Sequence, residues 1–569
     1  METAATAAVS TSISSVERTR AAYARIDEVD RPDVWITLRS IESALEDAER
    51  VDREVAAGRQ LPLAGCVVAV KDNVDVAGLP TTAACVRFGY VPDRTAPAVQ
   101  QLMDAGAVVL GKTNLDQFAT GLVGTRSPYG VVRHAWLDGR IAGGSSSGSA
   151  VAVALGIADL GVGTDTAGSG RVPAALHGIV GFKTTPGVVS TSGVVPACPS
   201  YDCVTIFASS LAAAESAVWT MADPRVAWPA GTPLAPTPQP VVAVPAGGVE
   251  GLSAEGAAAF AELLELLEAA GAVCREIDLG PFLAASRLLY GSALVAERYA
   301  SFGAFVEAQT DGIDPSVRSI VEAARGFRAH ELVRARCELE ALRDAASAAL
   351  GDADALVLPT VLEHPTLDAV VAAPLAVNAR LGRLTSFANL FQMPAVAVPA
   401  GRADGGPFGV TVLARPYADR VAAGVAALVT GEGGAGASPP APPALPLLVL
   451  GAHMRGQPLN RELTGRGAAF VADVCTAPRY RMYALATSPP KPGLLAAPDG
   501  GGSIEGELWH VPPAALAVVL ASLPEPMTLG PVELADGGVV TGFFCQAAAT
   551  AGAREITALG SWRRFLEES

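Results

Sequence analysis

Three side chains in the first third of the sequence could together activate a hydroxyl nucleophile: Lys71, Ser145 and Ser169. A serine hydroxyl attacks a carbonyl only when a base removes its proton. A lysine can be that base if its amine is neutral, and burial favours neutrality by penalising the charged form. Lowering a lysine pKa from about 10.4 to about 7 costs about 4 kcal/mol. The three residue types therefore predict proton transfer to a lysine and acyl transfer to a serine.

The two serines lie in glycine-rich loops, GGSSSGS at 143–149 and GTDTAGSGR at 163–171. The second loop follows an expected strand and precedes a helix that begins near Pro173. Its backbone N–H groups can therefore point at a developing oxyanion. The first loop, taken alone, also suits a flexible linker or a phosphate-binding loop, although it lacks the GK[ST] ending of a P-loop.

Residues 144–148 also match the G-x-S-x-G pattern of the α/β-hydrolase nucleophile elbow, with Ser146 as the nucleophile. That elbow requires a buried strand immediately before it. The preceding segment, RHAWLDGRIAG, contains three charged side chains and two glycines. We therefore expect no strand there and reject the elbow interpretation.

The elements that must position these loops alternate between strands and helices. Apolar runs predict strands at 65–70, 107–110, 160–163, 273–279, 355–358, 395–399 and 408–413. Helical spacing covers 15–58, 98–105, 150–157, 254–270, 315–326 and 330–350. This alternation predicts an α/β domain with a sheet covered on both faces. Lys71 follows the first strand, although taken by itself it is better interpreted as a surface lysine paired with Asp72 or Asp75.

Composition excludes several classes of protein. Half of the 569 residues are hydrophobic and 17% are charged, which excludes a largely disordered chain. The net charge of −16 disfavours nucleic acid and anionic membranes as partners. The eight cysteines form no CxxC pair, so we expect free thiols and no metal site. Without a secretory signal pattern or a membrane-spanning apolar run, the expected location is cytoplasmic.

The composition changes near residue 431. Residues 431–446 read GEGGAGASPPAPPALP, which is typical of a linker that builds no core. We expect a main domain over 1–430 and a second domain over 447–569, with strands near 481–485, 504–511 and 539–544.

Lys71, the GGSSSGS loop and GTDTAGSGR together resemble the amidase signature family, most strongly over 60–210. The resemblance implies a Ser–cis-Ser–Lys triad: Ser169 is the nucleophile, Ser145 relays the proton and Lys71 is the base. It implies no metal and no cofactor. It also implies an oxyanion hole from the backbone N–H groups of Thr166, Ala167, Gly168 and Ser169, with the loops held by Ser146, Asp165 and Arg171.

The segments TAGSGRVPAA, GVVPACPSYDCVTIFA and LLYGSALVAERY are similar to the allophanate-hydrolysing branch of this family. The similarity implies that Tyr290 and Arg298, on one helix over 288–299, hold the small-molecule substrate allophanate (urea-1-carboxylate). A guanidinium can grip its carboxylate bidentately. Without the resemblance, Arg298 would be assigned to an ordinary solvated helix face. The sequence departs from the branch at Ser292-Ala293-Leu294.

Segments of the second domain, including VLGAHMRGQPLN and REITALGSWRRFL, are similar to the accessory domain of that branch. The expected fold is therefore α/β, an amidase signature fold with a large mixed β-sheet covered by helices, plus a small C-terminal α+β γ-glutamylcyclotransferase-like barrel domain. His453 is the candidate for activity in the second domain, and a structural histidine is an equal alternative. The resemblance implies a homodimer that hydrolyses allophanate. The alternatives are a signature amidase for another small amide and an amidotransferase-like subunit of a complex.

Overall fold

The computed structural model describes residues 13–309, 311–432 and 443–568. It divides into two compact units, residues 1–226 with 240–440 and residues 227–239 with 441–569. Residues 227–239 thus group with the second unit, which no sequence pattern indicates. The predicted linker at 431–446 lies mostly outside the described residues, and the predicted domain boundaries stay a prediction.

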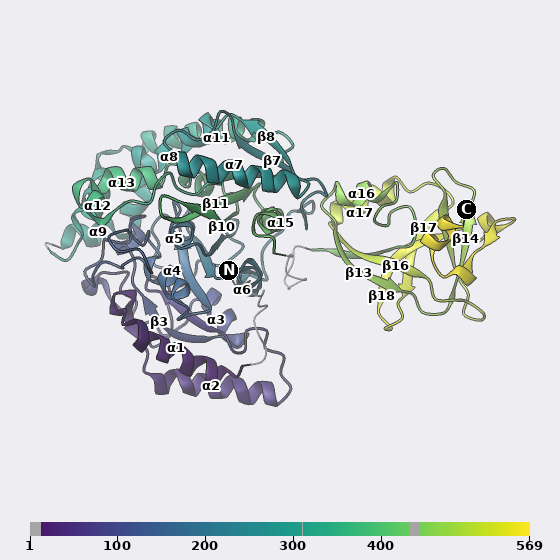
Figure 1. Cartoon of the computed structure of the whole chain (residues 1–569), viewed down its shortest axis with the longest axis horizontal. Coiled ribbons are helices and arrows are strands. Elements are labelled where there is room, and N and C mark those ends of the chain that lie inside the picture. Colours follow the sequence, from purple (N-terminus) through teal and green to yellow (C-terminus); the bar gives the residue numbers. More distant parts are fainter. Residues whose placement is uncertain (1–12, 310, 433–442, 569) are drawn as a thin grey trace. The chain divides into compact units, whose positions relative to one another are not determined.

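An eleven-stranded mixed sheet forms the centre of the first unit (Figure 1), in the order β1-β3-β2-β4-β6-β5-β10-β11-β9-β7-β8. Strands β3, β2 and β4 are parallel, as are β9, β7 and β8, whereas the strands between these groups are antiparallel. The strands are β1 (Trp35–Leu38), β2 (Val67–Lys71), β3 (Val108–Thr113), β4 (Leu160–Asp165), β5 (Val180–Lys183), β6 (Cys203–Ala208), β7 (Val241–Pro245), β8 (Val273–Ile277), β9 (Ala355–Pro359), β10 (Ala395–Ala403) and β11 (Gly406–Ala414).

Helices cover this sheet, and Figure 1 shows α7, α8 and α11 over the end that carries β7 and β8. The helices of the first unit are α1 (Ser15–Val29), α2 (Ile41–Ala56), α3 (Pro97–Asp104), α4 (Ser147–Ala154), α5 (Val172–His177), α6 (Leu211–Met221), α7 (Ala254–Ala269), α8 (Gly280–Gly291), α9 (Ala296–Ala308), α10 (Pro315–Ala323), α11 (Ala329–Leu350), α12 (Leu367–Ala372), α13 (Pro374–Leu381), α14 (Ser386–Leu390) and α15 (Asp419–Thr430).

The predicted strands of the first unit are confirmed, and so is the alternation with helices. Strand β1 lies inside the region predicted to be helical, where it pairs antiparallel with β3 at the sheet edge. The single helix predicted over 288–299 is wrong. Helix α8 ends at Gly291, Ser292 takes an extended conformation, and α9 begins at Ala296. The Ser292 hydroxyl accepts a hydrogen bond from the amide of Leu294, which stabilises the break.

The second unit contains a five-stranded sheet, β13-β16-β12-β18-β17, and a three-stranded sheet, β15-β14-β19. The strands predicted near 481–485, 504–511 and 539–544 are confirmed as β14, β16 and β18. The elements are β12 (Leu445–Val449), α16 (Asn460–Thr464), β13 (Ala469–Cys475), β14 (Tyr480–Leu485), β15 (Lys491–Ala496), β16 (Glu505–Val511), α17 (Pro513–Ala521), β17 (Met527–Glu533), β18 (Val539–Cys545), β19 (Arg554–Glu555) and α18 (Trp562–Glu567). Within the described ranges, no helix of either unit has the length and apolarity needed to cross a membrane.

Candidate active site

Lys71 ends strand β2 and is completely buried. Its Nζ lies 2.8 Å from Oγ of Ser145 and 2.7 Å from Oγ1 of Thr164. Burial lowers the pKa of Lys71 from 10.5 to about 7, against the opposing effect of three nearby carboxylates. Asp72, its possible surface partner, instead pairs with the buried Lys112 at 3.3 Å. The Lys71 amine is therefore partly neutral near pH 7 and able to accept a proton from a hydroxyl.

The loop after strand β3 contacts both serines, Ser145 through Asp116 and Ser169 through Gly121. The peptide bond between Gly144 and Ser145 is cis, the form that the family resemblance implies. The Ser145 carbonyl accepts a hydrogen bond from the Asp116 amide at 3.1 Å. A Cβ added to Gly144 or Gly121 would lie 2.2 or 2.6 Å from Oδ2 of Asp116, so both positions require glycine. Gly121 in turn holds the nucleophile candidate, because its carbonyl accepts a hydrogen bond from the Ser169 hydroxyl at 3.4 Å.

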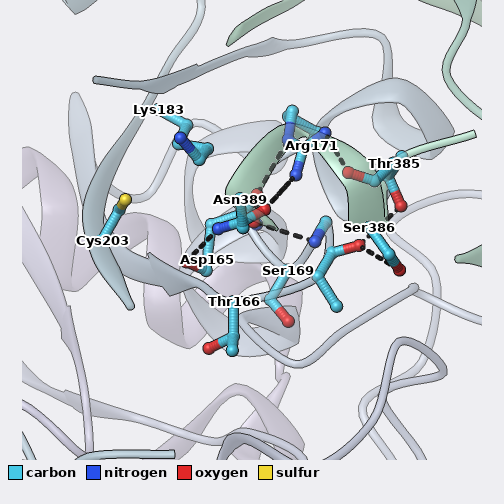
Figure 2. A network of polar contacts seen from close by, with 12 residues as sticks. Asp165, Thr166, Ser169, Arg171, Lys183, Cys203, Thr385, Ser386 and Asn389 are labelled. Atoms are coloured by element: carbon cyan, nitrogen blue, oxygen red, sulfur yellow. Dashed lines mark hydrogen bonds and ion pairs between the residues drawn. The ribbon is translucent and has the colours of Figure 1, made fainter. Parts of the chain in front are cut away.

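A buried ion pair shapes the loop that carries Ser169. Asp165 and Arg171 form two hydrogen bonds of 2.9 and 3.0 Å, and neither side chain is exposed. Burial alone would raise the pKa of Asp165, but the Arg171 guanidinium outweighs it and lowers that pKa. Figure 2 shows Arg171 above Asp165, and Thr166 and Ser169 below. Since both ends of the loop are tied to one carboxylate–guanidinium pair, its backbone has a defined shape.

Residues from a distant part of the sequence complete this network (Figure 2). Arg171 donates to the Thr385 carbonyl at 3.0 Å and to Oδ1 of Asn389 at 2.8 Å. The Thr385 and Ser386 hydroxyls donate to the Ala167 carbonyl at 2.6 and 3.3 Å. These contacts orient the Ala167 peptide, so that its carbonyl faces helix α14 and not the nucleophile.

The backbone amides of the loop are not equivalent. The Gly168 amide donates to Oδ1 of Asp165 at 2.8 Å, so it is already hydrogen-bonded in this structure. In the described part of the chain, the amides of Thr166, Ala167 and Ser169 have no hydrogen-bond partner. The Thr166 side chain donates to Oδ1 of Asp202. The arrangement leaves the amides of Thr166, Ala167 and Ser169 available to a negatively charged oxygen, and the oxyanion hole stays a prediction.

The Ser146 hydroxyl makes hydrogen bonds that hold two loops together. Its hydroxyl donates to the Thr164 carbonyl at 3.0 Å and accepts from the Thr164 amide at 3.3 Å, which ties the GGSSSGS loop to the end of β4. Helix α4 starts at Ser147, and the residues directly before the loop form no strand. The structure therefore lacks the strand–turn–helix geometry of a nucleophile elbow at this position.

Tyr290 and Arg298 meet although they lie on different helices. Arg298 Nη2 donates to the Tyr290 hydroxyl at 2.8 Å, and Nη1 donates to Oγ1 of Thr120 at 2.9 Å. The guanidinium carbon lies 4.9 Å from the centre of the Tyr290 ring. Arg298 is completely buried, and among the described residues its guanidinium makes no hydrogen bond to a carboxylate, although the nearby buried Asp202 carboxylate helps to raise its pKa.

A cavity of about 660 Å³ borders this region. Tyr290 lines it together with Asn378 and Ser386. Asn378 accepts a hydrogen bond from the amide of Leu122, next to Gly121, and Ser386 contacts the oxyanion loop. Arg298 and the loop of Ser169 do not line this cavity themselves, and they contact it through Tyr290 and Ser386.

His453 belongs to the second unit. Its Nε2 lies 3.3 Å from Oε2 of Glu462, and its ring stacks on Phe543 with centroids 5.1 Å apart. Burial lowers the pKa of His453, which Glu462 partly offsets. The histidine lines a cavity of about 210 Å³ that also contains Lys491. These contacts fit either a structural histidine or a second small site.

Several polar residues at the site escape prediction from the sequence. Thr164 contacts Lys71, and Asp116 and Thr120 contact the residues around both serines. The signal for Asp116 and Thr120 is their position just after β3, where functional residues of α/β sheets gather. Thr385, Ser386 and Asn389 have no such signal. Among the described residues no cluster of His, Cys, Asp and Glu suits a metal ion.

Two known protein families match this chain, one in each unit. The amidase family model matches residues 17–421, and the model of the allophanate hydrolase C-terminal domain matches residues 445–567. Urea amidolyase from Lachancea kluyveri is 39% identical over 572 residues, which cover 94% of this chain and 31% of that protein. The chain therefore spans about a third of the length of that relative.

Solved structures extend the similarity to the whole chain. Allophanate hydrolase from Kluyveromyces lactis matches with a TM-score of 0.88 and 34% identity, covering 98% of this chain and 97% of that one. Peptide amidase from Stenotrophomonas maltophilia matches with a TM-score of 0.59 and 28% identity, covering 74% of this chain and 93% of that one. These similarities confirm the predicted fold class.

Proposed function

Because the chain belongs to the amidase family and carries the C-terminal domain of allophanate hydrolases, we propose that it hydrolyses allophanate at the terminal amide. Allophanate is small, carries one carboxylate and offers one primary amide. The proposal therefore requires a nucleophile, a base, an oxyanion hole and a cation that binds the carboxylate.

The observation that carries the choice of substrate is the buried Arg298 guanidinium. A buried cation is costly unless a negative charge compensates it. In the described structure Arg298 contacts only the neutral hydroxyls of Tyr290 and Thr120 through its Nη atoms, and its Nε is buried without a partner. A substrate carboxylate would add a directly paired negative charge and accept two hydrogen bonds from the guanidinium.

The reaction begins with proton transfer between the three predicted residues. Ser169 turns its hydroxyl from the Gly121 carbonyl toward Ser145 and gives up its proton as it attacks the amide carbon. Ser145 passes its own proton to neutral Lys71. The negative charge on the substrate oxygen is stabilised by amides of the loop, among those of Thr166, Ala167 and Ser169, because preorganised N–H donors in a buried site act strongly on developing charge.

The acyl-enzyme then forms and breaks down. The C–N bond of the terminal amide breaks, and the nitrogen leaves as ammonia after it receives a proton from Lys71 through Ser145. Water attacks the ester on Ser169 with the same groups acting in reverse. Allophanate and water thus give ammonia and N-carboxycarbamate, which loses carbon dioxide and breaks down to ammonia and carbon dioxide.

An ammonia-release assay on the purified chain tests this function. Allophanate is compared with its uncharged amide biuret and with urea, malonamide and benzamide. Allophanate should give the highest kcat/KM. Preference for an uncharged amide would favour a signature amidase of other specificity. Dependence of all turnover on added subunits would favour an amidotransferase-like component.

Replacing Arg298 by alanine should raise KM for allophanate much more than KM for biuret. Losing one partner of a buried charge pair costs about 2–5 kcal/mol, which corresponds to a fall in kcat/KM of about 30-fold to several thousand-fold. Steady-state kinetics with both substrates measure the difference. The matched control is Arg402→Ala, since Arg402 is exposed on the hairpin of β10 and β11. An equal loss on both substrates would exclude carboxylate binding by Arg298.

His453→Asn should leave the initial rate of amide cleavage within about twofold of the unchanged enzyme, because residues without shared partners act independently. Lys71, Ser145 and Ser169 all belong to the first unit, whereas His453 belongs to the second. The disappearance of allophanate, followed separately from total ammonia, measures the first step alone. A large loss in that step would assign His453 to amide cleavage.

A cytoplasmic homodimer stays a prediction from the sequence.

A further inference from the structure

Thr120 is a buried residue that connects the carboxylate-binding arginine to the segment that holds the nucleophile. Its hydroxyl donates to the Phe118 carbonyl at 3.1 Å and accepts from Arg298 Nη1 at 2.9 Å. Because its proton is used on Phe118, the hydroxyl presents a lone pair to the guanidinium. The position of Arg298 is thus fixed from two sides, by Tyr290 and by Thr120.

The backbone of Thr120 holds a second buried arginine. The Thr120 carbonyl accepts a hydrogen bond from Arg126 Nη1 at 2.9 Å, and Arg126 Nη2 donates to the Pro374 carbonyl at 3.1 Å. The guanidinium of Arg126, like that of Arg298, makes no hydrogen bond to a carboxylate among the described residues, and its Nε is buried without a hydrogen bond. Thr120 therefore lies between two guanidinium groups and holds both through neutral oxygens.

The residue after Thr120 contacts the nucleophile. The Gly121 carbonyl accepts the hydrogen bond of the Ser169 hydroxyl at 3.4 Å. Consecutive Cα atoms lie about 3.8 Å apart. One dipeptide therefore contacts both the carboxylate-binding guanidinium and the attacking hydroxyl. In allophanate the carboxylate is joined to the attacked carbonyl carbon through a single nitrogen, so this separation must be short.

The conformation before Thr120 is held in place by its surroundings. Phe118 and Ala119 have φ values of 53° and 51°, which side chains other than glycine rarely adopt. Phe118 stacks on Phe302 with centroids 4.5 Å apart, and Phe302 lies one helical turn after Arg298 on α9. Strained backbone of this kind persists where the neighbouring structure imposes it, and it gathers at functional sites.

We propose that Thr120 is a positioning residue that sets the Arg298 guanidinium at the distance from Ser169 that allophanate requires. The proposal rests on the function proposed above and deepens it. Allophanate carries its carboxylate one nitrogen away from the attacked carbonyl carbon, and the Thr120 hydroxyl would determine this specificity without touching the substrate. Thr120 thus acts through Arg298 and takes no part in proton transfer.

Thr120→Val tests the proposal, because valine keeps the shape of threonine and removes the hydroxyl. KM for allophanate should rise about tenfold or more, as expected for a lost hydrogen bond to a charged group. Its kcat should change much less, and kcat/KM for biuret should change little. Thr120→Ser keeps the hydroxyl and should restore KM to within about threefold of the unchanged enzyme.

The control is Thr411→Val, which removes another buried hydroxyl of the first unit, one that contacts Thr360 at 2.9 Å. It should lower thermal stability by a similar amount without raising KM. If Thr120→Val does not fold, Thr120→Ala and Thr120→Ser make the same comparison.

Two results would overturn the proposal while the proposed function stands. The first is an equal loss on allophanate and biuret, and the second is a serine variant no better than the valine variant. Failure of the unchanged enzyme to hydrolyse allophanate would instead overturn the proposed function, and this proposal with it.

Discussion

Replacing Ser169 by alanine should lower kcat for ammonia release by about four to six orders of magnitude, because removing the nucleophile of a hydrolase leaves only binding and oxyanion stabilisation. The fold should persist. The Ser169 hydroxyl makes a single long hydrogen bond, 3.4 Å to the Gly121 carbonyl. Loop shape depends instead on Asp165 and Arg171, which the substitution leaves intact. Ammonia release and thermal unfolding, measured on the same sample, separate the two effects.

The neighbouring loop offers a control for this experiment. Ser147 is completely buried and its hydroxyl has no hydrogen-bond partner, so Ser147→Ala should alter neither kcat nor the folded structure strongly. Ser146→Ala tests the rejected interpretation in which Ser146 is the nucleophile of a nucleophile elbow. It removes two contacts to Thr164 and should reduce activity far less than Ser169→Ala. Full activity in the Ser169 variant, with loss in the Ser146 variant, would assign the nucleophile to Ser146.

The residues proposed for proton transfer could be predicted because each lies in a local pattern. The run VVAVK ends a fully buried strand, and burial alone is enough to lower the pKa of a lysine. The serines lie in loops whose glycines are required by close contacts, as at Gly144 beside Asp116. In both cases the chemical environment is set by residues within a few positions along the chain.

The partners of these loops could not be predicted, because they are distant along the chain. Arg171 contacts residues that lie 214 and 218 positions away. Thr385 and Asn389 accept hydrogen bonds from Arg171 only because α14 packs beside the loop of Ser169, and this packing leaves no local pattern in the sequence. Strands β5, β6 and β7 also fall outside the predicted elements, since an apolar run of four to six residues is compatible with either a strand or a helix.

The substrate-binding pair shows how a single residue redirects an element. Tyr290 and Arg298 are eight residues apart, so on one continuous helix they would lie about 12 Å apart along its axis. The extended conformation of Ser292 ends α8 and lets α9 turn back. The two side chains then come within 2.8 Å. The loop of Ser169 differs from the family pattern in one respect. The pattern assigns four backbone amides to the oxyanion hole, whereas the Gly168 amide here donates a hydrogen bond to the Asp165 side chain.

Substituting Lys71 should remove most of the catalytic rate and the pH dependence with it. General-base catalysis contributes about 10²–10⁴-fold, so Lys71→Met should lower kcat by at least that factor. In the unchanged enzyme the active form of Lys71 is neutral. Its pKa is about 7, lowered by burial. Activity should therefore rise with pH, reach half its maximum near pH 7, and fall to about a tenth one pH unit below that midpoint.

Lys71→Arg distinguishes a base from a structural cation. Arginine keeps a positive charge and several N–H donors, but its pKa above about 12 prevents it from accepting a proton. If Lys71 acts as the base, the arginine variant should be as inactive as the methionine variant. If Lys71 only ties Ser145 to Thr164, arginine should preserve much of the rate. A profile of kcat/KM between pH 5.5 and 9 completes the test. A flat profile in the unchanged enzyme would contradict a neutral lysine base, because protonation of the buried amine below pH 7 must block proton transfer from Ser145.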